Sequence, residues 1–118
     1  MNTLKPRLRV LHGEEIALGP GKVALLEAVA RAGSIAAAGR EFGMSYRRAW
    51  LLVDELNHMF AVPLVATREG GRNGGGAALT EAGTAIVSMY REAERKARRT
   101  AAREIDAIEK ELAAKQIG

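Results

Sequence analysis

Residues 34–57 constrain the fold more than any other part of the chain, because two helical stretches are separated there by one glycine. Residues 35–42 form the first helical run, Gly43 forms the turn, and residues 46–59 form the second run. A serine directly precedes each run, where its hydroxyl can accept a hydrogen bond from a free backbone N–H. These serines are Ser34 and Ser45. The spacing predicts a helix-turn-helix.

Small side chains dominate the first run, which allows two helices to cross closely. The run contains Ala36, Ala37, Ala38 and Gly39. A glycine inside a helix costs about 1 kcal/mol of helix propensity relative to alanine. Close packing against the second run explains why Gly39 is present. The simpler interpretation, a core contact between small residues, makes no statement about function.

The second run separates apolar and polar side chains onto opposite faces. The apolar face carries Ala49, Val53, Leu56 and Phe60, with Leu52 beside it. The opposite face carries Arg47, Arg48, Leu51, Glu55 and His58. An exposed face that begins with two arginines is typical of a helix that reads DNA, because a guanidinium can bond guanine O6 and N7 together or clamp a phosphate. The alternative is an ordinary solvated helix face.

Neighbouring residues extend this predicted DNA-binding face. Ser45 and Tyr46 can bond phosphates through their hydroxyls at the helix N-terminus, and Leu51 can contact a thymine methyl group. Ser34, which directly precedes the first run, is also a candidate DNA contact. Trp50 lies at the edge of the apolar face, and we expect it to pack against a neighbouring helix rather than contact DNA.

A β-hairpin is predicted directly after the helix-turn-helix. Residues 64–67 and 77–79 form its strands, and the glycine-rich residues 70–76 form its tip. A hairpin in this place is a wing, whose arginines can follow phosphates or enter the minor groove. The candidate contacts are Thr67, Arg68, Arg72 and Asn73. A nucleotide-binding loop is disfavoured, because no Gly-Lys-Ser/Thr follows; a disordered hairpin tip is the other alternative.

The residues before the helix-turn-helix predict a short hairpin and one helix. Residues 7–11 and 16–18 form short strands, and Gly19-Pro20-Gly21 stops the second strand. Residues 22–32 then show helical spacing, and Gly33 ends that helix.

A single long helix is predicted from Thr80 to near Gly118, about 50 Å in length at ~1.5 Å per residue. Its apolar residues recur at coiled-coil spacing and predict a dimerisation seam. The seam residues are Ile86, Tyr90, Ala93, Ala97, Ala101, Ile105, Ile108 and Leu112. So long a helix cannot bury its far end on a small domain, so a two-fold dimer that reads a palindromic site is expected. A frayed tail from Ala101 onward is the alternative.

The composition argues against several other functions. Lys and Arg number 18 against 14 Asp and Glu, a net charge of +4 that fits a polyanionic partner. The chain contains no cysteine, and no apolar run reaches the length of a membrane helix or a secretion signal. His12 and His58 lack metal-ligand spacing, and no catalytic constellation stands out. We therefore expect a cytoplasmic protein with no enzyme activity, no metal, no cofactor and no membrane partner.

The chain resembles the N-terminal DNA-binding domain of the molybdate-responsive ModE-type regulators over residues 21–90. The resemblance is carried by Ser34-Ile35, Gly43-Met44-Ser45-Tyr46, Ala49-Trp50, Glu55-Leu56-Asn57, residues 70–77, Leu79-Thr80 and Gly83. Residues 34–45 alone are also similar to LysR-type regulators. The resemblance implies a winged helix-turn-helix dimer that regulates transcription at palindromic operators. It also implies DNA contacts from Ser45, Tyr46, Arg47, Arg48, Arg68 and Arg72.

Together these patterns predict a mainly α fold with a small β-wing. Residues 1–79 are expected to form the DNA-binding domain and residues 80–118 the dimerisation helix. The family's oxyanion-sensing domain is not expected in this chain, so a response to molybdate is not predicted. Two alternatives remain: a winged-helix protein-interaction module, and a nucleoid-type protein that binds double-stranded DNA without sequence preference.

Overall fold

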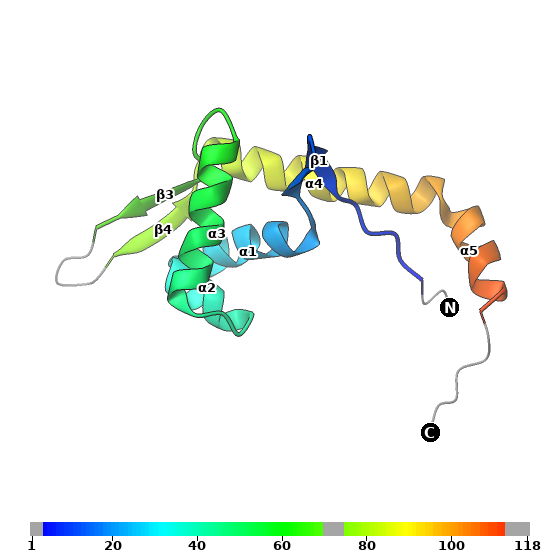
Figure 1. Ribbon diagram of the computed structural model, residues 1–118, viewed down its shortest axis with the longest axis horizontal. Coiled ribbons are helices and arrows are strands. Elements are labelled where there is room, and N and C mark those ends of the chain that lie inside the picture. The colour runs from blue at the N-terminus through cyan, green and yellow to red at the C-terminus, as the bar shows by residue number, and fades with distance from the viewer. Residues whose placement is uncertain (1–3, 70–74, 113–118) are drawn as a thin grey trace, which may run out of the picture.

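A computed structural model describes residues 4–69 and 75–112 of this protein. In chain order the elements are β1 (Val10–His12), β2 (Glu15–Leu18), α1 (Pro20–Ala32), α2 (Ile35–Glu41), α3 (Tyr46–Met59), β3 (Val65–Arg68), β4 (Gly76–Leu79), α4 (Glu81–Thr100) and α5 (Ala102–Lys110). Helices α1, α2 and α3 form the body, β3 and β4 project from it as a wing, and α4 runs from the base of the wing towards α5 (Figure 1). The predicted fold class, mainly α with a small β-wing, is confirmed.

Helix α1 begins earlier than the sequence suggested. Pro20 is its first residue, although Gly19-Pro20-Gly21 was expected to act only as a stop. Proline suits this position because the first helical N–H needs no partner within the helix. The helix ends as predicted at Gly33, whose φ of 75° is left-handed and whose N–H bonds Val29 O.

The helix-turn-helix forms with the predicted caps. Ser34 Oγ accepts a hydrogen bond from the Ala37 N–H at 3.0 Å, and Ser45 Oγ accepts one from the Arg48 N–H at 3.1 Å. Gly43 makes the turn with a φ of 69°. Helix α2 ends at Glu41, one residue before the predicted end, and α3 has the predicted bounds.

Helices α2 and α3 cross where the small residues were expected to bring them together. A Cβ atom placed on Gly39 would lie 2.8 Å from the Cβ of Ala49. Ala38, Gly39 and Ala49 are all buried at this crossing. The absence of a side chain at Gly39 therefore sets the distance between the two helices.

The core lies between α1, the crossing of α2 and α3, and the first half of α4. Its largest fully buried side chains are Leu25, Leu26, Leu56, Leu64, Val23 and Val29. Gly83 of α4 packs against this core through its backbone, because a Cβ there would overlap the carbonyl oxygen of Leu64. Helix α4 therefore starts in direct contact with the chain that leads into β3.

The wing is an antiparallel pair in which Val65 faces Leu79 and Arg68 faces Gly76. Each strand differs by one residue from its predicted bounds. Ala77 N–H bonds Gly33 O at 2.9 Å, which joins the wing to the turn between α1 and α2. The wing thus keeps a fixed position against the helix-turn-helix.

One amide side chain also joins α3 to the wing. Asn57 Oδ1 accepts hydrogen bonds from the N–H groups of Leu64 and Val65 at 2.8 and 3.0 Å. Its Nδ2 donates to Val65 O at 3.0 Å. These three bonds fix the end of α3 against the start of β3.

The prediction of one continuous C-terminal helix was wrong. Helices α4 and α5 are separated at Ala101, and α5 turns away from the line of α4 (Figure 1). The Ala101 N–H is shared between Ala97 O and Arg99 O, and its φ and ψ of −92° and 5° depart from helical values. Neither proline nor glycine marks this position in the sequence, and α5 buries no residue that would hold it in line with α4.

The N-terminal hairpin is shorter than predicted. Strand β1 pairs antiparallel with β2, with a bulge between Val10 and Leu11. The expected strand over residues 7–11 instead begins at Val10. Across the described residues, no helix combines the length and apolar character that crossing a bilayer requires.

Candidate nucleic-acid interface

The two arginines of α3 point away from the core. Ala49, Val53 and Leu56 bury the inner face of the helix, while Arg47 and Arg48 are exposed. Neither guanidinium forms an ion pair within residues 4–69 and 75–112. Both cations are therefore available to an external anion, as the sequence predicted.

The acidic side chain that shares a hollow with the two arginines is engaged elsewhere. Arg47, Arg48 and Glu55 line one shallow hollow of about 330 Å³. The Glu55 carboxylate lies 3.2 Å from Lys22 Nζ, which also donates to Ile16 O at 2.7 Å. This pairing with α1 offsets the negative charge of Glu55 and leaves the face around the arginines cationic.

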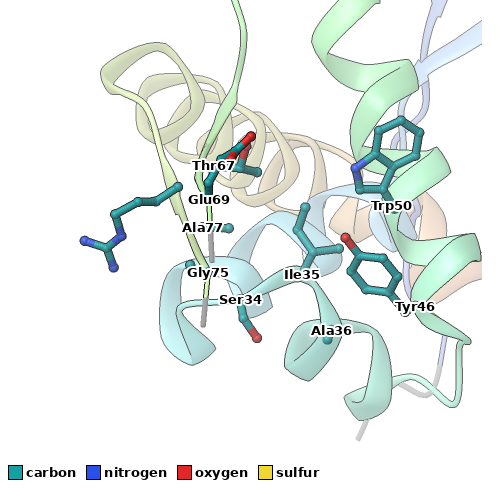
Figure 2. A pocket seen from close by; sticks show the side chains of 11 residues that line it. Ser34, Ile35, Ala36, Tyr46, Trp50, Thr67, Glu69, Gly75 and Ala77 are labelled. Carbon is teal, nitrogen blue, oxygen red and sulfur yellow. The ribbon is translucent and has the colours of Figure 1, made fainter. Parts of the chain in front are cut away.

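A cleft of about 480 Å³ separates α3 from the wing. Its lining residues are Ser34, Ile35, Ala36, Tyr46, Trp50, Thr67, Arg68, Glu69, Gly75, Gly76 and Ala77. Figure 2 shows the rings of Tyr46 and Trp50 on the α3 side, opposite Ser34 and the wing residues. Three separate elements therefore contribute to one concave surface beside the arginines.

The expected packing role of Trp50 was wrong. The Trp50 side chain is 42% exposed and lines the cleft, as does Tyr46 at 59%. The two residues are four positions apart on α3, so they occupy the same face one turn apart. That spacing relative to Tyr46 was the sequence signal that pointed to this placement, and assigning Trp50 from the apolar stripe alone missed it.

Ser34 and Ser45, both predicted DNA contacts, also cap helices α2 and α3, which limits the hydrogen bonds that they can offer to DNA. Ser34 lines the cleft and Ser45 lies beside the arginines, but each oxygen already accepts a backbone N–H as a helix cap. Each hydroxyl keeps its proton free to donate to a phosphate oxygen. Leu51 is exposed on the same side as the arginines.

The wing contributes Thr67 and Arg68, which are both exposed and line the cleft. Gly76 faces Arg68 across the hairpin, and a Cβ on Gly76 would lie 2.9 Å from Arg68 Nη2. The missing side chain leaves room for the guanidinium beside β4. The other predicted wing contacts, Arg72 and Asn73, lie outside the described residues.

The predicted dimerisation seam is divided by the structure. Tyr90 is only 3% exposed and its hydroxyl donates to Leu8 O, while Ile86 packs against the core. These two residues were expected to face a partner, but they are used inside their own chain. Ala93 is exposed and Ala97, Ala101 and Ile105 are half-buried. Ile108 and Leu112 are exposed.

The two histidines lie closer together than their sequence positions suggested. His12 and His58 line one hollow between the N-terminal hairpin and α3. His58 Nδ1 is 2.8 Å from Asp54 O. Among the residues that are described, no cluster of three or more His, Cys, Asp or Glu has the arrangement of a metal site.

The resemblance to ModE-type proteins is confirmed by comparison with known proteins. The chain is 49% identical over 73 residues to the molybdenum-pterin-binding protein MopA of Rhodobacter capsulatus, covering 62% of this chain and 28% of that protein. It is 45% identical over 78 residues to the molybdenum transport protein ModE of Azotobacter vinelandii, covering 66% and 29%. For the DNA-binding transcriptional dual regulator ModE of Escherichia coli K12, the identity is 37% over 71 residues, covering 60% and 27%. The chain thus spans less than a third of the length of these relatives.

A solved structure has the same arrangement of elements. The crystal structure of a CbnR_DBD–DNA complex aligns with a TM-score of 0.56 and 27% identity, over 75% of this chain and 95% of that chain. Residues 21–84 match the family model of the bacterial regulatory helix-turn-helix proteins of the lysR family. That match runs from the second residue of α1 to the start of α4, and so contains the whole helix-turn-helix and wing. This chain therefore belongs to the lysR family of bacterial regulatory helix-turn-helix proteins.

Proposed function

We propose that the chain is the DNA-binding unit of a cytoplasmic transcriptional regulator, which acts as a homodimer on a palindromic DNA site. The observation that carries the proposal is the exposed, unpaired arginine pair on α3 beside the cleft to the wing. Helix α3 enters the major groove, where Arg47 and Arg48 contact bases and phosphates. The wing follows the neighbouring phosphates through Thr67 and Arg68. Arg72 and Asn73 belong to the same proposed wing contacts.

Dimerisation completes the proposed function because one half-site gives limited specificity. The proposed contact is the part of the seam that remains open, formed by Ala93, Ala97, Ala101, Ile105, Ile108 and Leu112. Its support is the presence of exposed apolar side chains near the C-terminal end, at Ile108 and Leu112. Two copies related by a two-fold axis present two α3 helices to one palindrome.

We propose regulation without catalysis, since the Escherichia coli relative is a DNA-binding transcriptional regulator and the exposed arginines of α3 suit a docking surface. The molybdenum-related activities named for the relatives do not extend to this chain, because the shared region covers less than a third of those proteins. Protein docking and binding to DNA of any sequence are the competing functions. Recovery of a palindrome from genomic fragments, with a large ratio of specific to non-specific affinity, separates the proposal from both.

The variant Arg47→Ala/Arg48→Ala tests the proposed face. We expect specific binding to be lost while thermal unfolding is unchanged, because both side chains are exposed and unpaired. The measurement is a fluorescence-anisotropy titration with the recovered operator. Arg98→Ala/Arg103→Ala, which removes the same charge from α4 and α5, is the control and should keep operator preference. Unchanged operator affinity in the α3 variant would count against the proposed face.

A further inference from the structure

An ion-pair cluster joins α4 to the body of the protein. Arg91 of α4 bonds Glu27 of α1 with two nitrogens, from Nε to Oε2 at 3.0 Å and from Nη2 to Oε1 at 2.7 Å. Its third nitrogen, Nη1, bonds Glu94 Oε1 at 2.7 Å. The guanidinium of Arg91 thus holds the carboxylates of Glu27 and Glu94 in place. These three residues are called the Arg91 clamp below.

The clamp is largely withdrawn from solvent. The side chain of Glu94 is 9% exposed, and those of Arg91 and Glu27 are 30% and 32% exposed. The hydrogen bonds from Arg91 lower the pKa of Glu27, against the opposing effect of burial. A bidentate pair of this kind restricts the orientation of both side chains, which a single contact between point charges does not do.

A second contact strengthens the clamp from the N-terminal side. Tyr90 is buried, and its hydroxyl donates to Leu8 O in the segment before β1. The Arg91 Cζ atom lies 5.7 Å from the centroid of the Tyr90 ring. The N-terminal segment, α1 and α4 therefore meet at one point along α4.

The first half of helix α4 packs against the core through Ala82, Ile86 and Val87, and two specific contacts mark the ends of this packed stretch. The first is Gly83, where its backbone touches Leu64. The second is the Arg91 clamp, about 12 Å further along at ~1.5 Å per residue. Beyond Glu94 no described residue of α4 or α5 is buried. The clamp is therefore the last firm contact before α4 leaves the body.

We propose that the Arg91 clamp is a positioning device that fixes the angle of α4 against α3 and so sets the spacing between operator half-sites. The inference rests on the dimeric DNA binding proposed above. Residues 83–100 of a helix span about 26 Å, so a tilt of roughly 10° displaces the far end by about 4.5 Å. That shift exceeds one base-pair rise of ~3.4 Å. Loss of the clamp therefore changes which spacing the two α3 helices can reach.

The experiment compares Glu27→Gln and Arg91→Ala with the wild-type chain on synthetic duplexes. Each duplex carries two inverted copies of the half-site recovered by genomic selection, with spacings that differ by single base pairs, and one duplex carries a single half-site. In the variants we expect the preference for one spacing to fall roughly tenfold, a typical coupling within one network. Affinity for the single half-site should be unchanged, which a general loss of folding would not produce.

The matched control is Arg95→Ala. Arg95 pairs with Glu92 on the same exposed side of α4, so this variant breaks an ion pair without touching the body. We expect it to keep the wild-type spacing preference. A spacing preference in Glu27→Gln and Arg91→Ala equal to that of wild type and control would overturn the positioning role.

A second measurement does not depend on DNA or on dimerisation. The chain has no cysteine, so Ala30→Cys on α1 and Arg98→Cys on α4 accept spin labels at chosen exposed sites. Labelled chains are diluted with unlabelled chains, and the distance distribution within one chain is recorded. Arg91→Ala should broaden the distribution and Arg95→Ala should not; equal widths contradict the clamp. If the wild-type chain shows no spacing preference, the proposed dimeric function is contradicted instead. In that case the label distances still show whether the Arg91 clamp fixes the orientation of α4.

Discussion

Among single residues, Asn57 joins α3 to the wing. Its amide satisfies the N–H groups of Leu64 and Val65 and the carbonyl of Val65 at the same time. The asparagine amide offers an oxygen with two acceptor lone pairs and a separate donor nitrogen, so one side chain can make all three bonds. The angle between α3 and β3, and hence the shape of the cleft, depends on it.

Asn57→Ala is expected to lower the free energy of unfolding by about 2–4 kcal/mol, because it leaves partly buried backbone N–H groups without partners. Urea unfolding followed by circular dichroism measures the change. His58→Ala, on the exposed side of the same turn, is the control and should shift it by less than about 0.5 kcal/mol. If the urea midpoint of Asn57→Ala matches that of the wild type, these three bonds contribute nothing to the free energy of unfolding.

Trp50 is the only tryptophan, so its fluorescence reports on the cleft alone. Because the ring is partly exposed and faces the wing, bound DNA should change its surroundings. We expect its emission to be quenched or shifted when operator DNA is added, with saturation at the stoichiometry of binding. Emission that stays constant while anisotropy reports full binding would place Trp50 outside the interface.

At the scale of elements, local signals in the sequence were sufficient for α1, α2 and α3. Caps at Ser34 and Ser45 and the left-handed end at Gly33 involve neighbours within four positions, and such contacts can be identified from spacing alone. The close approach at Gly39 followed from residue size in the same way. For the candidate site, the exposure of Arg47 and Arg48 was predictable from helical periodicity.

Contacts between distant parts of the chain could not be predicted in this way. Tyr90 was assigned to a dimer seam because its spacing fits one, but it bonds Leu8, 82 positions away. The pairing of Arg91 could not be identified from spacing either, because its partner Glu27 lies 64 positions away. The break at Ala101 carries no proline or glycine signal. In each case the partner that decides the outcome is set by tertiary packing.

The pairing of α1 with α4 has a pH dependence that follows from its chemistry. Hydrogen bonds from Arg91 lower the folded-state pKa of Glu27 below its ordinary value of 4.5. A carboxylate whose pKa is lowered stabilises the fold above its unfolded pKa, and this contribution disappears as pH falls through the folded pKa. The stability advantage of wild type over Glu27→Gln should therefore be present at neutral pH and vanish in acid.

Urea unfolding of both proteins across this range tests the prediction. Glu14→Gln removes a carboxylate that forms no ion pair in the described ranges, and it is the control for a general effect of charge. A difference between wild type and Glu27→Gln that stays constant from neutral pH to acid would contradict the assigned role of the Arg91 bonds.

In the whole molecule, the wing and the first half of α4 are bonded to the body formed by α1, α2 and α3, and the rest of α4 extends away from it with α5 (Figure 1). The wing is bonded to the α1–α2 turn and to α3, and the clamp joins α4 to the same body. The cationic face of α3 and the open part of the predicted seam lie on different elements. One chain can therefore contact DNA through α3 and, at the same time, contact a second copy of the chain through α4 and α5.

DNA cleavage from a fixed position on the protein shows whether α3 occupies the major groove in each half of a two-fold site. Asp54→Cys on α3 carries the sole thiol of the chain, to which an iron chelate is attached; Arg98→Cys on α4 is the control. We expect two clusters of cuts, about 10 base pairs apart or a multiple of that, from the α3 label only. Operator that is fully bound yet uncut by the α3 label, or cut identically by both labels, would contradict this placement of α3.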